Sequence, residues 1–228
     1  AGPIDGLSPT AAVYHYAPYQ HALEQRLIFR PDDWKSLAAQ LPPGAVLIAL
    51  TSIYWRESWK YGERAFRYCH HDVGHAIGAV AFSAATLGWR TRLIDGVGDD
   101  ELARLLGVDR QQGIEAEHPD ALLAVFPADA DPPATLALRW PAALGSWLPT
   151  AEFTGVPNRL SHNHHPWPVI DEVAQASRHT PALSRRTDCQ SVPPPTPFHP
   201  KESGPGPFPD RPLPAEQIIR QRRSAVDM

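Results

Sequence analysis

The chain has 228 residues, 43% of them hydrophobic, which is enough to bury one sizeable core with extensions. A formal net charge of -4 offers no electrostatic basis for binding nucleic acid or an anionic membrane. The 2 cysteines are too few for a disulfide framework, and no apolar run approaches the roughly 18 residues of a membrane span. We therefore expect a cytoplasmic protein without nucleic-acid or membrane partners.

The N-terminal part alternates between extended and helical patterns. Residues 13–16 (VYHY) predict a short strand, whereas residues 21–29 fit either a returning strand or a short helix. Acidic residues after Pro31 predict the start of a helix that ends at the Pro-Pro-Gly of residues 42–44. The continuous apolar run at residues 45–50 predicts a strand buried on both faces.

A long helix follows and carries most of the ionisable residues. Its apolar residues recur at steps of three and four, which predicts one buried stripe ending near Gly88. The stripe comprises Phe66, Cys69, Val73, Ile77, Val80, Ala84 and Leu87. Polar residues recur at similar steps on another face, namely Lys60, Arg64, Tyr68, His71 and His75.

Three further elements follow the long helix. The patterns predict a strand at residues 90–94, a short helix with acidic residues at its start at 99–106, and a second buried strand at 121–126. The order strand, helix, strand, helix, strand over residues 45–127 indicates a mixed α/β or α+β domain.

The composition predicts four segments. Residues 1–127 form the domain, and residues 128–180 form an extension with one short amphipathic helix at 167–177. Residues 181–214 are rich in proline and predict a linker. Residues 215–228 regain helical spacing, which suggests the start of a second module.

The histidines of the long helix permit a metal hypothesis. Residues 71–75 (HDVGH) place two histidines on one helix face, as in the HExxH motif of zinc hydrolases. Asp72 has a shorter reach than the glutamate of that motif, and a third ligand would have to come from His162, His164 or His165. Hydrogen-bonding or packing roles are commoner for such pairs, so a zinc hydrolase is an alternative and not the leading hypothesis.

Other residues of the long helix also have two interpretations. Lys60 beside Tyr61 could exchange protons with a substrate, especially if partial burial lowers the pKa of the lysine, or the two could be an ordinary surface pair. Arg64 and Arg67 could hold a phosphate or carboxylate, or pair with nearby glutamates. Cys69 lies on the apolar stripe, so we expect it in the core and not as a nucleophile.

Two glycines interrupt the helix interior. Gly74 and Gly78 each cost roughly 1 kcal/mol relative to alanine at such positions. Either a flat ligand or another backbone approaches them closely, or the helix simply packs against another helix.

Two segments carry a family resemblance. Residues 54–89 resemble the central signature of the nitroreductase superfamily, specifically its SagB/ThcOx-type dehydrogenase branch, which includes the azoline oxidases; they read YWRESWKYGERAFRYCHHDVGHAIGAVAFSAATLGW. Residues 6–27 (GLSPTAAVYHYAPYQHALEQRL) resemble an earlier segment of the same branch. The likeness covers about residues 5–127, with both segments in the expected order.

The resemblance implies an α+β nitroreductase-like fold with a mixed sheet and a central buried helix. It also implies FMN bound at a subunit interface of a homodimer or tandem pseudo-dimer, and two-electron oxidoreduction of a small-molecule or peptide substrate. In the azoline oxidases a Lys-Tyr pair of the WKYG motif serves in acid–base chemistry, and Lys60 and Tyr61 match it. Arg64, Arg67 and Tyr68 are candidate flavin or substrate contacts.

The family's opening motif is displaced in this chain. An Arg-Arg-Ser sequence that grips the flavin phosphate precedes the domain in the family, but here Arg222, Arg223 and Ser224 match it after the linker. We therefore expect an incomplete module followed by the start of a second one. The alternative is a flavin-free nitroreductase-like scaffold that binds a peptide or a partner subunit.

Overall fold

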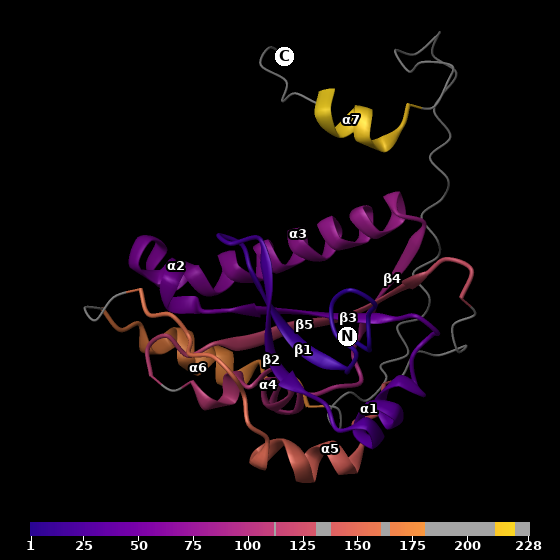
Figure 1. Ribbon diagram of the computed structural model, residues 1–228. Coiled ribbons are helices and arrows are strands. Elements are labelled where there is room, and N and C mark those ends of the chain that lie inside the picture. The colour runs from indigo at the N-terminus through magenta and orange to yellow at the C-terminus, as the bar shows by residue number, and fades with distance from the viewer. Residues whose placement is uncertain (112, 131–137, 161–164, 181–212, 222–228) are drawn as a thin grey trace, which may run out of the picture. The chain divides into compact units, whose positions relative to one another are not determined.

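The N-terminal residues fold into a hairpin of two antiparallel strands, β1 (Ala12–Ala17) and β2 (Ala22–Ile28) (Figure 1). The returning segment is a strand because its backbone groups pair with β1. The register shifts between Val13 and Tyr14 and leaves Arg26 as the extra residue on β2. Such a β-bulge bends the strand and redirects the side chain of the extra residue.

The chain forms two compact units, Ala1–Ser184 and Arg185–Met228. The computed structural model describes residues 1–111, 113–130, 138–160, 165–180 and 213–221. In the second unit it describes one helix, α7 (Ala215–Gln221), in which Arg220 and Glu216 form an ion pair at 2.8 Å. All other described elements belong to the first unit.

The main sheet has three strands, β3 (Val46–Ser52), β4 (Trp89–Ile94) and β5 (His118–Pro127), in the order β3-β5-β4. Residues 121–126 of β5 are buried as predicted, because helices cover both faces of this central strand (Figure 1). β3 is an edge strand and only half-buried, so the expectation of burial on both faces is wrong. The pairs among the described strands are all antiparallel, so the parallel pairs of a mixed sheet are not among them.

The expected long helix is two helices, α2 (Tyr54–Tyr61) and α3 (Ala65–Thr86), joined by a 3-10 turn, η1 (Gly62–Arg64). Gly62 separates them, because its φ of +58° is incompatible with a continuing α-helix. Lys60 therefore does not share one continuous helix face with the residues of α3, and the predicted polar face is interrupted there.

α3 crosses one face of the main sheet, and α4 (Asp99–Leu106) lies on the other (Figure 1). The bounds of α4 agree with the prediction. α3 buries Ala65, Cys69 and Ala84, whereas Phe82 is 78% exposed. The α+β class is confirmed, but the centrally buried helix is not found, because the described elements cover α3 mainly from its sheet side.

The extension contributes directly to the core of the first unit. Leu138, Leu144 and Leu148 are almost fully buried with Leu37 and Phe126. Each such side chain contributes about 1.5–3 kcal/mol when fully buried. No helix among the described residues is both long and apolar enough to cross a membrane. The remaining elements are α1 (Pro31–Ala38), η2 (Val108–Arg110), α5 (Ala142–Trp147), η3 (Leu148–Thr150) and α6 (Pro168–Ala176).

Candidate functional site

The predicted acid–base pair ends α2. Lys60 is exposed, and its Nζ lies 4.9 Å from the centroid of the Tyr61 ring. A side-chain hydrogen bond with Tyr61 raises the pKa of Lys60 above its ordinary value. This is opposite to the lowering that burial would cause, because solvent reaches the ammonium group. Lys60 is therefore protonated near neutral pH.

The predicted cofactor contacts are only partly brought together. The ring of Tyr68 lies 4.7 Å from that of Tyr61, so Lys60 and these two tyrosines form one cluster. Arg64 and Arg67 are exposed, and neither has an ion-pair partner among the described residues. The remaining predicted contacts, Arg222, Arg223 and Ser224, lie outside the described residues.

The described residues do not favour the zinc hypothesis. His71 and His75 are exposed, and Nδ1 of His75 donates to the carbonyl oxygen of His71 at 2.9 Å. Within the described ranges, no three or more histidine, cysteine, aspartate or glutamate side chains gather as metal ligands. A Cβ added to Gly74 or Gly78 would point into open space, so no other backbone among the described residues approaches these glycines closely.

A broad groove of about 1010 Å³ lies between the hairpin, the end of β3 and the two helices. Tyr14 and Arg26 line it from the hairpin, Ser52 from β3 and Arg56 from α2. Cys69 lines it from α3; it is 6% exposed, which confirms its predicted place in the core. Burial raises the pKa of its thiol to about 11, so the thiol is inert near neutral pH.

On the hairpin side of this groove, two side chains carry hydrogen-bond donors that have no acceptor among the described residues. Oη of Tyr14 is sealed from water and has no partner among the described residues. Arg26 is half-buried and forms no ion pair within them. A Cβ on Gly155 would stand 2.2 Å from Nη1 of Arg26, so a larger residue there would displace the guanidinium. Because buried donors are normally paired, the groove suits a ligand that carries acceptor oxygens.

The guanidinium of Arg56 is hydrogen-bonded within the protein. Its Nη2 donates to Oε2 of Glu115 at 3.1 Å and to Oδ1 of Asn158 at 3.0 Å. These bonds connect α2 to the extension and fix one wall of the groove.

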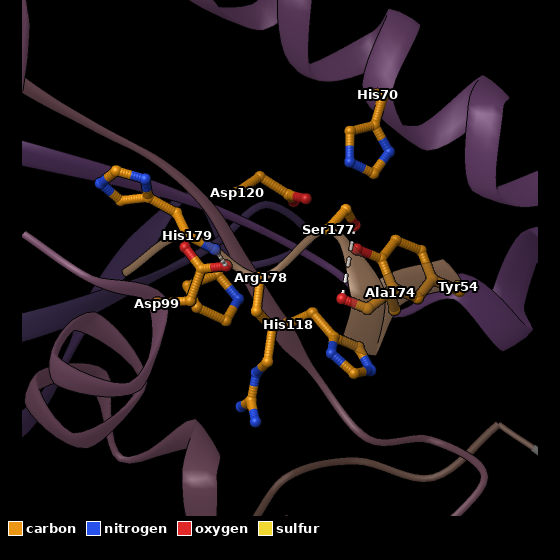
Figure 2. Close-up of a pocket in the computed structure, with 10 residues that line it drawn as sticks. Tyr54, His70, Asp99, His118, Asp120, Ala174, Ser177, Arg178 and His179 are labelled. Carbon is orange, nitrogen blue, oxygen red and sulfur yellow. Dashed lines mark hydrogen bonds between the residues drawn. The ribbon is translucent and has the colours of Figure 1, made fainter. Parts of the chain in front are cut away.

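A second, smaller cavity of about 140 Å³ is lined by residues of α2, α3 and β5 (Figure 2). Aromatic rings form one wall: Tyr54 stacks on His118 with centroids 4.7 Å apart, and His70 lies 6.1 Å from Tyr54. Asp99 and the residues after α6 close the other wall. We call this space the polar cavity; its remaining lining residues are Pro119, Asp120, Ala174, Ser177, Arg178 and His179.

Asp120 reaches the polar cavity through a second β-bulge. Leu50 pairs with Ala121 and Thr51 with Pro119, which leaves Asp120 as the extra residue of β5. Its Oδ2 is buried and has no partner among the described residues. Burial raises the pKa of this carboxyl to about 6. Asp120 therefore changes charge close to neutral pH.

His118, which also lines the polar cavity, is uncharged near neutral pH. Burial lowers the pKa of His118 below its ordinary value. His118 therefore does not act as the counter-ion of Asp120 near neutral pH. Burial also raises the pKa of Tyr54, so its hydroxyl keeps its proton.

Pattern reasoning did not identify Tyr14, Arg26, Ser52 and Asp120 as site residues. A polar pair at the start of an apolar strand, His118 and Asp120, was the available signal for the polar cavity. The bulges that aim Arg26 and Asp120 depend on strand register, which no local pattern specifies.

Comparison with known proteins places the chain in a family. Residues 10–124 match the nitroreductase family. A nitroreductase-family protein of Methanocaldococcus jannaschii is 29% identical over 100 residues, which are 42% of this chain and 50% of that protein. A solved structure of a nitroreductase-family protein from Anabaena variabilis shares 24% identity at a TM-score of 0.44, and the match covers 65% of this chain and 33% of that one. The chain thus spans about half the length of its curated relative. It belongs to the nitroreductase family.

Proposed function

We propose that this chain is part of an FMN-dependent oxidoreductase of the SagB-type branch, which carries out two-electron redox chemistry on a small molecule or peptide. The observation that supports this most directly is the groove of about 1010 Å³ with unpaired donors, in a chain of the nitroreductase family. Its volume is at the upper end of the roughly 300–1,000 Å³ of small-molecule and cofactor sites.

The residues of the groove fit a flavin. Tyr14 and Arg26 would donate hydrogen bonds to its acceptor oxygens, and Cys69 and Val73 would supply an apolar wall. A bound flavin would supply the hydride-transfer chemistry, while the protein places and polarises the substrate. Arg222, Arg223 and Ser224 stay candidate cofactor contacts, as the resemblance implies.

The acid–base pair is close to this groove along α2. Lys60 follows the groove residue Arg56 by four positions, and Tyr61 follows the groove residue Glu57 by four. Residues four apart share a helix face, so both stand one turn beyond the groove wall. We propose Lys60 as proton donor, supported by its contact with Tyr61, since its Nζ lies 4.9 Å from the centroid of that ring. Arg64, Arg67 and Tyr68 stay candidate contacts for ligand parts that extend past the groove.

A homodimer or tandem pseudo-dimer is part of the proposal. α3 exposes Phe82, which is 78% accessible, and two glycines with open space beside them, Gly74 and Gly78. Small residues allow close approach of a second backbone, and a large exposed apolar side chain favours a covering partner. Analytical ultracentrifugation of the wild type and of Phe82→Glu tests this, with a shift toward monomer expected for the variant.

FMN titration tests the proposed cofactor. We expect FMN to bind with quenched fluorescence and a shifted visible spectrum, and Tyr14→Phe with Arg26→Gln to weaken binding at least tenfold, since each change removes a donor. The exposed Arg92→Gln serves as the matched control on another strand. Protein that stays colourless with added FMN would refute the cofactor and favour the flavin-free scaffold.

The role of Lys60 has its own test in the FMN-loaded protein. Lys60→Met should lower turnover roughly a hundredfold, in the range of general acid catalysis, without changing FMN affinity. Lys35→Met is the matched control, because Lys35 is an exposed lysine of α1 far from the pair in sequence. Equal turnover in the two variants would show that Lys60 takes no part.

A further inference from the structure

The side chains around the polar cavity keep hydrogen-bond acceptors for it, because their donor hydrogens are used within the protein. Nδ1 of His70 donates to the carbonyl oxygen of Phe66 at 2.8 Å, which leaves Nε2 of the neutral ring as an acceptor. Nε2 of His179 donates to the carbonyl oxygen of Asp95 at 2.8 Å, which leaves Nδ1 in the same way. Oγ of Ser177 donates to backbone carbonyl oxygens of α6 and retains its lone pairs. A molecule in this cavity would therefore have to bring the donors.

A carboxylate without a partner also lines the cavity. Oδ2 of Asp120 is sealed from water and has no partner in the described part of the chain. The nearby cation, Arg178, is already paired with Asp100 at 2.7 Å. Asp99 adds a second carboxylate, whose Oδ2 accepts from a backbone N–H. Because a buried carboxylate is costly without a counter-charge, the lining favours a ligand that is a cation.

The cavity suits a small organic cation better than a metal ion. Its volume is about 140 Å³, close to the roughly 150 Å³ of a cavity that binds benzene, so it holds roughly six heavy atoms. Among the described residues, no three histidine, cysteine, aspartate or glutamate side chains gather as metal ligands. The stacked rings of Tyr54 and His118, with centroids 4.7 Å apart, form a wall against which carbon atoms can pack. His70 is exposed, so a ligand reaches the cavity from solvent beside it.

We propose that the polar cavity is a binding site for a small primary amine, held as its ammonium form against the carboxylate of Asp120. An ammonium group carries three N–H donors, which matches the acceptors on Asp120, His70 and Ser177. Figure 2 shows His70 directed from α3 toward the side where Asp120 lies. The carbon chain of the amine packs on Tyr54, and it carries no carboxylate, because Asp99 would repel one.

This amine site is separate from the proposed oxidoreductase site. In the described part of the chain, the polar cavity and the groove share no lining residue. The elements α2, α3 and β5 nevertheless contribute residues to both spaces, so an amine in the cavity contacts the same elements that form the groove. Because the cavity is formed without the flavin, amine binding is measured on the protein without flavin.

Nuclear magnetic resonance of the whole chain tests the site. At pH 8 the carboxyl of Asp120 is charged, because its pKa is about 6. We expect n-butylammonium to shift its carbon-13 signal saturably, with a Kd on the order of 1 mM for a ligand of about five heavy atoms. Tetramethylammonium has the charge but no N–H donor, and butan-1-ol has the chain but no charge, so each should bind at least about tenfold more weakly. Equal responses to all three compounds would overturn the proposal.

Matched variants locate the bound amine. Asp120→Asn keeps the size of the side chain and removes its charge, so it should weaken n-butylammonium binding at least about tenfold, followed by the backbone amide shifts of β5. Asp95→Asn is the control, because it removes an exposed charge outside the cavity lining. His70→Phe should weaken binding about threefold or more, whereas His75→Phe, which loses the same kind of bond to its own helix, should not.

Two outcomes would refute the amine site. Wild-type protein without saturable binding of n-butylammonium would show that the cavity holds only water. Unchanged affinity in Asp120→Asn would show that the amine binds elsewhere on the protein. Both outcomes are distinct from a failure of the proposed function, which the FMN titration of the groove measures.

Discussion

Asp99 and His179 exchange two hydrogen bonds although 80 positions separate them. The backbone N–H of His179 donates to Oδ2 of Asp99 at 2.8 Å, and the N–H of Asp99 donates to the carbonyl oxygen of His179 at 3.0 Å. The same carboxylate lies at the start of α4, where negative charge favours a helix. The pair thus fastens the residues after α6 over the polar cavity.

Loss of this pair should destabilise the first unit. Asp99→Ala removes a charged acceptor from a partly buried N–H, so we expect the free energy of unfolding to fall by about 1–3 kcal/mol. Urea denaturation followed by far-UV circular dichroism measures it. Asp95→Ala is the control, because the structure gives Asp95 only a backbone contact, from Nε2 of His179 to its carbonyl oxygen at 2.8 Å. Equal effects of the two substitutions would contradict a specific role for the Asp99 carboxylate.

Gly88 and Gly107 have the same φ of +74°. Comparing their substitution by alanine therefore separates the cost of backbone strain from the cost of a steric clash. A Cβ added to Gly88 would meet none of the described atoms within 4 Å, whereas a Cβ added to Gly107 would lie 2.5 Å from Cδ1 of Phe153. Gly88→Ala should cost about 1–2 kcal/mol from strain alone. Gly107→Ala should cost about 1–3 kcal/mol more, because the ring must move. Chemical denaturation checks the difference, and equal costs would show that Phe153 yields freely.

Asp120 should make stability depend on pH. Its pKa rises from an ordinary 3.8 to about 6 in the fold, so the folded state binds the proton more tightly than the unfolded state. This contribution is complete below about pH 4 and is lost as the pH rises through about 6. Asp120→Asn should therefore be more stable than wild type at pH 7.5, by up to about 3 kcal/mol, and no different at pH 4. A stability difference that does not change with pH would contradict the assignment.

Cys69 should be chemically silent in the folded protein. It is 6% exposed, and burial raises the pKa of its thiol to about 11. In a Cys189→Ser background, we expect a disulfide reagent at pH 8 to modify Cys69 at least a hundredfold more slowly than after denaturation, since the thiolate is the reactive form. Rapid modification of the folded protein would show that the groove side opens to the thiol.

Local pattern determined several elements of this fold. Residues 99–106 form a helix because acidic residues favour its start and Gly107 ends it with a left-handed φ of +74°. Residues 121–126 are a continuous apolar run and form the buried centre of β5. Neighbouring positions also bring the proposed acid–base pair together, since Lys60 and Tyr61 are adjacent in the chain.

Other features could not be predicted from local sequence patterns. The helical spacing continues through Gly62, yet the chain breaks there, where a Cβ would meet the ring of Trp167 at 3.3 Å. β3 has the composition of a doubly buried strand but lies at a sheet edge. In both cases a partner distant in sequence decides the outcome.

The sequence by itself determined the class of fold, the family and the positions of most helices and strands, because these depend on periodicity and on motifs that neighbours in the chain define. Tertiary structure alone decided which side chains meet. The register shifts that free Arg26 and Asp120 from their ladders arise from pairing between separate strands. Each shift also decides which side chains face a cavity, because a shift of one residue moves a side chain to the other face of a sheet.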